Sequence, residues 1–230
     1  QIIIKIMFRG NSILGSMPPV VKNLLLINVI MYVITMITGN FMYENFALFY
    51  FKSPFFKPFQ LVTHMFMHGG FTHIFFNMYT LFIFGGVLER VWGSQKFLLY
   101  YFVTGIGAAL LHLGVMYLQL QGYIADVNAG DFMARANIQA LLSTPTVGAS
   151  GAIYGLLLAY GMLFPNNVMQ LIFPPVALKA KWFVLIFGAL ELLLGLSGRG
   201  GNVAHFAHLG GMIFGFFLIL YWKKNNRMYY

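Results

Sequence analysis

Ser150 has the clearest potential for chemistry in this sequence, because it lies among small residues at the start of an apolar segment. The surrounding string is Gly148-Ala149-Ser150-Gly151. A turn of small residues leaves a serine hydroxyl accessible, as an acyl-transfer nucleophile requires. Polar side chains in membrane-embedded segments are costly, and they are functional candidates by default. Ser150 is therefore a candidate nucleophile.

Histidines on other apolar segments are candidates for a base and for charge stabilisation. His73 and Asn77 lie four residues apart near the start of one segment, so they share one face of a helix. Their side chains could donate hydrogen bonds to a developing oxyanion. His205 and His208 lie at the start of the last apolar segment, and either could accept the serine proton.

Small residues recur at four-residue spacing on the segments that carry Ser150 and His208. The two stripes are Gly151, Gly155 and Ala159 on the first, and Ala207, Gly211 and Gly215 on the second. Such stripes let membrane helices approach closely. Packing them together predicts that the Ser150 hydroxyl and the His208 imidazole come within hydrogen-bond reach. His208 is preferred to His205 because Gly211 and Gly215 follow it by three and seven positions.

The other polar groups on or near the apolar segments have predicted structural roles. His64 and His68 are expected to bond loop backbone, and His112 is expected to be structural. Glu191, an acid in the fifth apolar run, is expected to be paired structurally rather than to be catalytic. The string from Gly85 to Arg90 has the pattern of a helix end with a cytoplasmic cap or ion pair.

The composition places this chain in a membrane: 60% of its residues are hydrophobic, 8% are charged, and its mean hydropathy is +0.77. Backbone groups in lipid must pair internally, so long apolar runs are helices. Six runs span or nearly span a bilayer, namely 22–39, 70–88, 97–118, 150–164, 181–196 and 204–222. The predicted fold class is an all-α membrane protein, a bundle of six transmembrane helices.

The sequence contains no cysteine. Disulfides, thiolate metal sites and a cysteine nucleophile are therefore excluded.

The basic residues indicate orientation rather than nucleic-acid binding, because the net charge of +9 forms no contiguous patch in the sequence. With a cytoplasmic N-terminus, ten of the 14 Lys and Arg fall in cytoplasmic segments. The other four, in outside loops, are Lys52, Lys57, Arg135 and Arg199. Both termini are therefore predicted to be cytoplasmic. The second, fourth and sixth helices then run from outside to inside, so their polar residues share one depth near the outer surface.

The predicted organisation is a cytoplasmic leader (1–21), a six-helix domain (22–222) and a basic cytoplasmic tail (223–230), with no cleavable signal peptide evident. The aromatic-rich loop 40–63 is expected at the headgroup level. An amphipathic helix is expected within 119–147. The fourth run is shorter than the roughly 20 residues of a full crossing. Its first residue is therefore expected below the membrane surface, at the floor of a wet cavity.

From about residue 20 to 222 the chain resembles the rhomboid intramembrane serine proteases. The matching strings are His64-Met65-Phe66-Met67-His68, His73 with Asn77, Gly85-Gly86 with Glu89-Arg90, Gly148-Ala149-Ser150-Gly151, and Ala207-His208 with Gly211 and Gly215. One departure is Phe59-Gln60, where family members often carry a Trp-Arg pair; it bears on a lipid contact of the first loop. In addition, Ala152 stands where a Gly-x-Ser-x-Gly elbow would have glycine, which argues against an α/β-hydrolase.

The resemblance implies roles for particular residues. It implies a Ser150–His208 catalytic dyad without a carboxylate, with Tyr154 stacked on the His208 ring to orient it. It also implies an oxyanion hole formed by the Ser150 backbone N–H with His73 and Asn77. The supporting residues of the expected site are Tyr154, Gly148, Gly151, Gly211 and Gly215.

The expected function is an intramembrane serine endopeptidase with an acyl-enzyme mechanism and neither cofactor nor metal. The resemblance implies membrane-protein substrates with a single transmembrane helix. Six spans without a seventh suggest the basic bacterial form, a multi-pass protein of the plasma membrane; its oligomeric state is left open. One alternative is an inactive relative that binds client helices, but such a protein should lack the serine or the histidine.

A second alternative is a membrane oxidoreductase whose metal or haem is held by His64 and His68 or by His205 and His208. It is disfavoured because the chain has no His-Glu-x-x-His motif and because no carboxylate is expected near these histidines.

Overall fold

The computed structural model describes residues 17–170, 176–197 and 204–225. Its helices are α2 (Pro19–Thr38), α3 (Asn40–Phe46), α4 (Gln60–Thr63), η1 (His64–Phe66), α5 (Phe71–Thr80), η2 (Leu81–Gly85), α6 (Gly86–Trp92), α7 (Ser94–Asn128), α8 (Ala134–Ser143), α9 (Ser150–Leu163), α10 (Ala180–Ser197) and α11 (His205–Lys224). Two short antiparallel strands, β1 (Val168–Gln170) and β2 (Ala177–Lys179), join α9 to α10. The sequence did not predict this hairpin.

Within the described ranges, five helical stretches are long and apolar enough to cross a membrane. They are 19–38, 71–92, 94–128, 180–197 and 205–224. The second of them runs through α5, η2 and α6 without a break. The fourth predicted span is α9, which has only 14 residues and is not among the five. The helical membrane bundle is therefore confirmed, whereas the count of six spanning helices is not.

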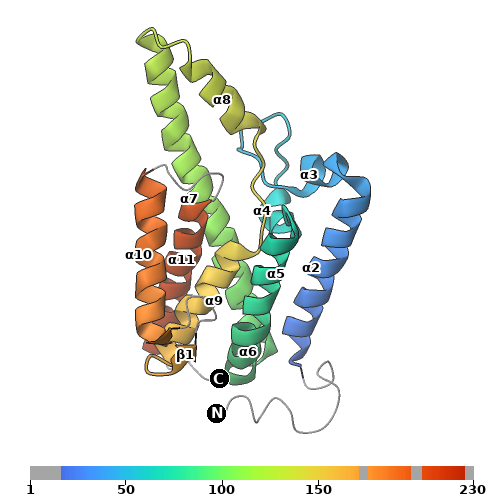
Figure 1. Ribbon diagram of the computed structural model, residues 1–230, viewed down its shortest axis with the longest axis vertical. Helices are drawn as coiled ribbons and strands as arrows, with labels where there is room; N and C mark the ends of the chain where they lie inside the picture. The colour runs from blue at the N-terminus through green and yellow to red at the C-terminus, as the bar shows by residue number, and fades with distance from the viewer. Residues whose placement is uncertain (1–16, 171–175, 198–203, 226–230) are drawn as a thin grey trace.

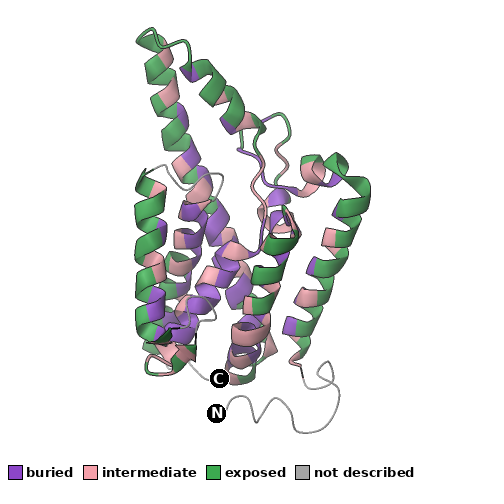
Figure 2. Ribbon diagram, viewed as in Figure 1, coloured by how far each residue is buried: buried purple, intermediate pink, exposed green. Residues whose placement is uncertain are grey.

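α9 lies in the middle of the bundle, between α5–α6 on one side and α10–α11 on the other (Figure 1). Nine of its 14 residues are buried, and Figure 2 shows it largely in the colour of buried residues. Its closest neighbours are α7 and α11. A helix surrounded by protein can be shorter than the bilayer, because its end groups find partners in protein rather than facing lipid.

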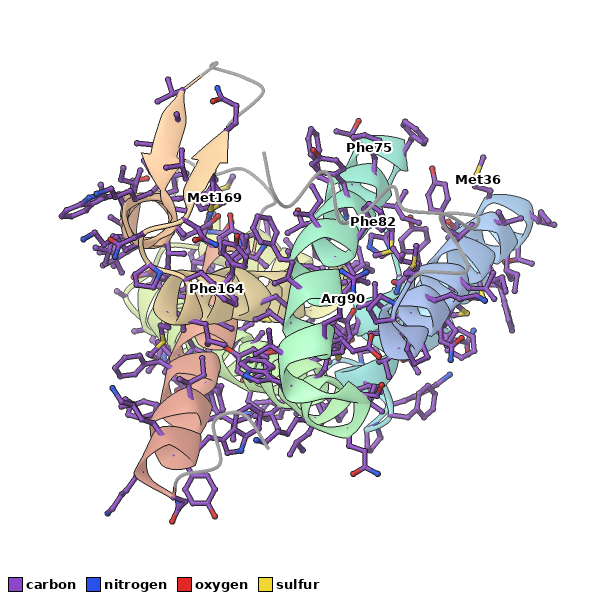
Figure 3. All side chains as sticks on the ribbon, turned by 90° about the horizontal axis from the view of Figure 1, so that it is seen from below. Met36, Phe75, Phe82, Arg90, Phe164 and Met169 are labelled. Atoms are coloured by element: carbon purple, nitrogen blue, oxygen red, sulfur yellow. The ribbon has the colours of Figure 1, made fainter. Side chains whose placement is uncertain are left out.

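The outer helices carry large apolar side chains on their free faces. Met36 of α2 and Phe75 of α5, seen from below in Figure 3, point away from the bundle and are 69% and 49% exposed. Exposed apolar side chains of this size on a spanning helix suit contact with lipid tails. The buried core lies at the centre, where α7, α9 and α11 meet.

The third predicted span is longer than expected, because α7 continues to Asn128 and carries the chain beyond the ends of its neighbours (Figure 1). α8 follows it, and is the helix expected within 119–147. The predicted leader and tail fall largely on residues outside the described ranges. The same is true of four residues used for the charge count, Lys5, Arg9, Arg199 and Arg227.

The Gly85–Arg90 string lies near the end of a helix, as the sequence suggested, because Arg90 is in the last turn of α6, which ends at Trp92. Its acid does act as a cap, but for another helix. The two carboxylate oxygens of Glu89 accept hydrogen bonds from the backbone N–H groups of Val20 and Val21, at 2.9 and 2.8 Å. Ser94 Oγ donates to the same carboxylate at 2.7 Å. Glu89 thus pairs amides in the first turn of α2, groups that a helix cannot pair internally.

Replacing Glu89 with alanine is expected to destabilise the protein by about 2–4 kcal/mol, because two amides in the first turn of α2 lose their acceptors. Thermal unfolding in detergent would measure the change. Glu44→Gln, which removes an exposed acid on α3, is the control and should leave the midpoint unchanged. Equal midpoints for Glu89→Ala and the parent would show that water replaces the carboxylate at no cost.

Candidate active site

Ser150 is the first residue of α9, and the loop before it is fixed on both sides. The backbone N–H of Gly148 donates to the carbonyl of His64 at 2.9 Å, and Thr146 exchanges two backbone hydrogen bonds with Leu48. Gly148 has φ +127°, a backbone conformation that favours glycine. These contacts hold the turn that presents the serine, so its position is set by the fold.

The structure brings the side chains of Ser150 and His208 together. His208 Nε2 lies 2.8 Å from Ser150 Oγ, within hydrogen-bond range. The ring of Tyr154, one turn after Ser150 on α9, stacks on the imidazole with centroids 4.2 Å apart and planes 6° from parallel. The imidazole is thus held between a tyrosine face and a serine hydroxyl. His205, the competing base of the sequence analysis, bonds elsewhere.

The predicted small-residue stripes lie where α9 and α11 pack against each other and against α7. A Cβ added to Gly211 of α11 would overlap the backbone carbonyl of Gly151 on α9. A Cβ on Gly151 would overlap Ala108 of α7, and one on Gly215 would overlap the hydroxyl of Tyr100. At Gly211 the backbones of α9 and α11 therefore approach too closely for any larger residue, while Gly151 and Gly215 allow α7 to pack closely against both helices. This approach brings His208 to Ser150.

His73 faces the same spot as the serine hydroxyl. A Cβ built on Gly148 would lie 2.7 Å from His73 Nε2 and 3.6 Å from Ser150 Oγ. The backbone N–H of Gly69 donates to His73 Nδ1 at 3.4 Å, which leaves the ring proton on Nε2, facing the serine. Asn77 Nδ2 donates to the carbonyl of His73 at 2.9 Å, so one of its two amide hydrogens is used within α5.

Glu191 of α10 is the functional candidate whose surroundings the sequence did not predict. The residue is 8% exposed, and its carboxylate lies 2.6 Å from His205 Nδ1. It also lies 3.0 Å from His208 Nδ1, close enough for an ion pair although the atoms are not aligned as a hydrogen bond. The hydroxyl of Tyr154 donates to it as well. The expectations that no carboxylate lies near these histidines and that the imidazole has no acid beside it are therefore wrong.

A signal for this acid was present in the sequence. In the predicted orientation α10 runs from inside to outside, so Glu191, in the second half of the helix, falls at the outer depth shared by the other polar groups. The rotation of α10 about its own axis decides whether the carboxylate faces the histidines or the lipid. That rotation depends on packing against α9 and α11, which periodicity does not reveal.

The other histidines have structural partners. His64 Nδ1 lies 2.8 Å from the carbonyl of Gln60, as expected for a loop contact, and burial lowers the pKa of His64 to about 4. His112 Nε2 lies 2.9 Å from Thr146 Oγ1. The ring nitrogens of His68 make no hydrogen bond, contrary to expectation, and the ring instead packs edge-on against His73.

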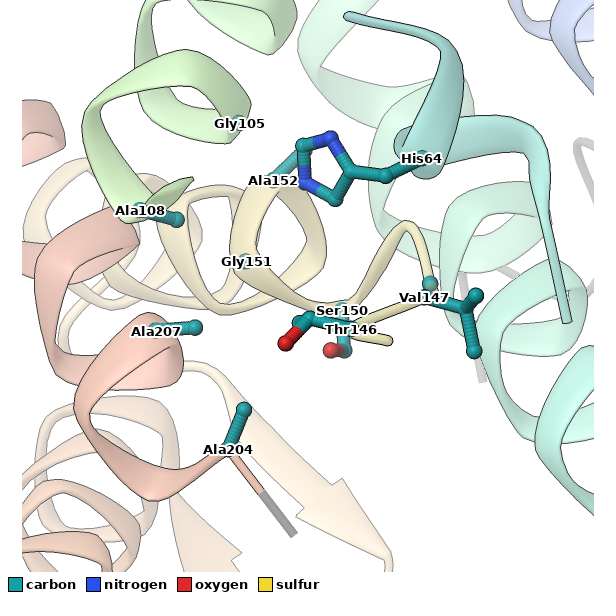
Figure 4. Close-up of a pocket in the computed structure, with 11 residues that line it drawn as sticks. His64, Gly105, Ala108, Thr146, Val147, Ser150, Gly151, Ala152, Ala204 and Ala207 are labelled. Carbon is teal, nitrogen blue, oxygen red and sulfur yellow. The ribbon is translucent and has the colours of Figure 1, made fainter. Parts of the chain in front are cut away.

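A small cavity lies beside the serine (Figure 4). His64 of η1 and the loop residue Thr146 line one side, Ser150 lies at its edge, and Ala207 of α11 lines the other side with Ala204, the residue just before that helix. It has room for about one water molecule. A water held here would be close to the hydroxyl.

Glu191, His205 and His208 are the one group in the described ranges with metal-binding side chains close together, with ligand atoms within 4.8 Å of one another. A metal here would have to compete for Glu191, which already contacts both histidines and Tyr154. It would also have to take His208 Nδ1 while Nε2 stays with the serine. The donor set can therefore bind a metal only by breaking contacts that the folded protein makes.

The fold and the site together define a multi-pass helical membrane protein with a partly buried serine–histidine pair. Residues 56–225 match the Rhomboid domain, and the chain belongs to the rhomboid family. The resemblance stated from the sequence is confirmed.

Individual relatives agree with this assignment. The chain is 30% identical to the rhomboid-family protein YdcA of Bacillus subtilis (strain 168), over 74% of this chain and 70% of that protein. It is 29% identical to Rhomboid protease AarA of Providencia stuartii, over 66% of this chain and 51% of the relative. It is 32% identical to RHOMBOID-like protein 4 of Arabidopsis thaliana, over 69% of this chain but 32% of that protein. The chain thus spans about half of the second relative and about a third of the third.

Proposed function

We propose that this protein is an intramembrane serine endopeptidase that cleaves transmembrane segments of membrane proteins. The observation that carries the proposal is the 2.8 Å separation of Ser150 Oγ and His208 Nε2, at the start of a buried helix within a membrane bundle. A nucleophile and a base within hydrogen-bond distance are what acyl transfer requires. Membership of the rhomboid family supports the same reaction.

In the proposed mechanism His208 Nε2 removes the proton from Ser150 as Oγ attacks the scissile carbonyl. The backbone N–H of Ser150 and the side chains of His73 and Asn77 donate to the oxyanion that develops. The imidazolium then gives its proton to the leaving amine, and the acyl-enzyme forms. A water from the adjacent cavity, activated by His208, hydrolyses the acyl-enzyme and regenerates the serine.

The proposed substrates are membrane proteins with a single transmembrane helix. A peptide bond in a helix is shielded by its hydrogen bonds, so helix-breaking residues near the cut should favour cleavage. The glycine and alanine residues around Ser150 leave little room, which favours small side chains beside the scissile bond. The protein needs no cofactor or metal in this mechanism, and it meets its substrate in the bilayer.

We also propose that the protein lies in the plasma membrane with both termini in the cytoplasm. The excess of Lys and Arg in the segments assigned to that side supports this orientation. The domain 22–222 then carries the activity, and the leader 1–21 and the tail 223–230 are cytoplasmic. This orientation places Ser150 nearer the outer surface.

Covalent labelling tests the nucleophile directly. The purified protein in lipid vesicles should react with a fluorophosphonate, and mass spectrometry should find the adduct on Ser150. Ser143→Ala, which removes an exposed serine on α8, is the matched control and should label like the parent. Denatured protein should not label.

Absence of labelling in folded protein, together with binding of helical clients without cleavage, would identify an inactive relative that binds clients. An adduct on another serine would place the nucleophile elsewhere. Either result contradicts the proposal.

A further inference from the structure

We infer that Glu191 is a positioning residue that extends the serine–histidine pair to a triad, an inference that rests on the proposed peptidase activity. Glu191 does not touch Ser150; it would act through His208. Its carboxylate lies 3.0 Å from His208 Nδ1, on the side of the ring opposite the serine contact at Nε2. This order of nucleophile, imidazole and acid is that of serine hydrolases in which a carboxylate orients the base.

The chemistry of a carboxylate assigns the protons of the site. An ionised carboxylate only accepts hydrogen bonds, so the nitrogens facing it carry hydrogen. His208 therefore holds its proton on Nδ1, and the lone pair of Nε2 faces the Ser150 hydroxyl. This is the tautomer that a general base needs. During attack the proton of Ser150 moves to Nε2, the imidazole becomes a cation, and the carboxylate stays ionised beside it.

The carboxylate itself is held in place by three groups. The hydroxyl of Tyr154 and Nδ1 of His205 both donate to it, and His208 Nδ1 is the third neighbour. Tyr154 contacts both His208, through its ring, and Glu191, through its hydroxyl. The imidazole is therefore fixed on its face and on its Nδ1 edge by two residues that also bind each other. Ring stacking alone would leave rotation within the ring plane unrestrained.

A buried acid in a membrane helix has a cost that packing alone does not explain. Glu191 is on α10, where its 17 companions between Ala180 and Ser197 include one other charged residue, Lys181 at the first turn. An apolar residue would fill the same space at lower cost. The three neighbours of Glu191 are the proposed base, a second histidine and the tyrosine stacked on the base. Orienting that base is a role that an apolar residue cannot perform.

The test compares Glu191→Gln, which keeps the size, with Glu191→Asp, which keeps the charge. Parent and variants are purified in detergent, and three quantities are measured: kcat/KM on a transmembrane reporter, the rate of fluorophosphonate labelling, and the thermal midpoint. Glu191→Gln can present an amide hydrogen to Nδ1 and so favour the wrong tautomer. We expect it to lower kcat/KM at neutral pH by roughly 10²–10⁴-fold and to slow labelling in parallel, with KM little changed.

The relative activities of Glu191→Gln and Glu191→Asp distinguish a role of the charge from a role in packing. If Glu191 orients and stabilises the imidazolium, Glu191→Asp retains more activity than Glu191→Gln although it fits less well. If Glu191 only packs, the isosteric Glu191→Gln is the more active. Glu44→Gln removes one exposed acid on α3 and is the charge control. Tyr154→Phe keeps the stacked ring and removes one donor to Glu191, so we expect a smaller loss than in Glu191→Gln.

The pH profile gives a readout that a structural role would not move. Removing a negative charge beside a cation disfavours the cation, so the acidic limb of the activity profile should shift to lower pH in Glu191→Gln. The titratable groups around His208 whose charge could contribute are Glu191, Tyr154, His205, His73 and His112. Of these only Glu191 is changed in the variant.

Three outcomes overturn the inference. In the first, kcat/KM of Glu191→Gln is within threefold of the parent value and the acidic limb of its pH profile is unchanged, while cleavage by the parent depends on Ser150. The triad is then wrong, and the proposed peptidase activity is retained. In the second, a metal survives purification and is required for cleavage, which would make Glu191 and its histidines ligands instead. In the third, cleavage does not depend on Ser150, which removes the peptidase proposal and the triad with it.

Discussion

Ser150→Ala is expected to lower kcat/KM on a transmembrane reporter by roughly 10⁴–10⁶-fold, to the background of the assay, and to leave the fold intact. The hydroxyl is lost, so no acyl-enzyme can form, while the methyl group of alanine fits where the serine side chain stood. His208→Ala should have an effect of similar size because Nε2 removes the proton. The double variant should be no slower than either single variant, since the two groups act as a unit.

The measurement is product formation by purified protein in lipid vesicles, with Ser143→Ala as the serine control. Thermal midpoints of all variants should be compared in the same detergent. The proposed mechanism would be falsified by a folded Ser150→Ala that cleaves as fast as the parent. Additive losses in the double variant would also count against it, because they would mean that the two residues act in separate steps.

Gly211→Ala is expected to lower activity severely through the addition of a single methyl group. The new Cβ would overlap the carbonyl of Gly151, a backbone atom that cannot rotate away. α11 must then move from α9, and His208, one turn before Gly211, moves with it. Misplacement of a catalytic group by about 1 Å can cost about 100-fold in rate. We also expect a loss of about 1–3 kcal/mol in stability from overpacking.

Gly114→Ala is the matched control, because this glycine is exposed on α7 and a Cβ there meets nothing within 4 Å. It should keep activity and the unfolding midpoint of the parent. Cleavage rates and thermal unfolding of the two glycine variants would be measured side by side. Equal cleavage rates and equal unfolding midpoints for the two variants would mean that α9 and α11 tolerate a wider separation. The small-residue stripe on α11 would then have no role in the site.

The sequence predicted best the Ser150–His208 pair, which depends on the close approach of α9 and α11. The stripes beginning at Gly151 and Ala207 indicated which faces make close contacts, because small residues at this spacing are typical of close contacts between membrane helices. Gly211 meets Gly151 as predicted, whereas Gly155 and Gly215 pack against α7. The structure brings together the side chains next to these stripes. The roles of Ser150, His208, His73 and Asn77 in catalysis remain predictions for the experiments above.

The sequence predicted less well those contacts that depend on rotation or on distant segments. Glu191 reaches the histidines only because of how α10 is turned, and a single acid in an 18-residue helix gives no periodic signal. Glu89 caps a helix 68 positions away, a pairing that no local pattern encodes. The π-helical turn at Leu81–Gly85 and the β1–β2 hairpin were not predicted either.

The short length of α9 has a consequence for the fate of cleaved products. Its 14 residues rise about 21 Å. If the far end of α9 is at the membrane boundary, the proposed orientation would place Ser150 about 9 Å inside a hydrocarbon core of about 30 Å. A substrate helix cut at that depth is divided unequally, into a hydrophobic stub of about six residues and a remainder of about 14. A stub of about six residues is too short to hold a protein in a bilayer. The proposed reaction would therefore turn an anchored protein into a diffusible one, and the remainder would stay behind in the membrane.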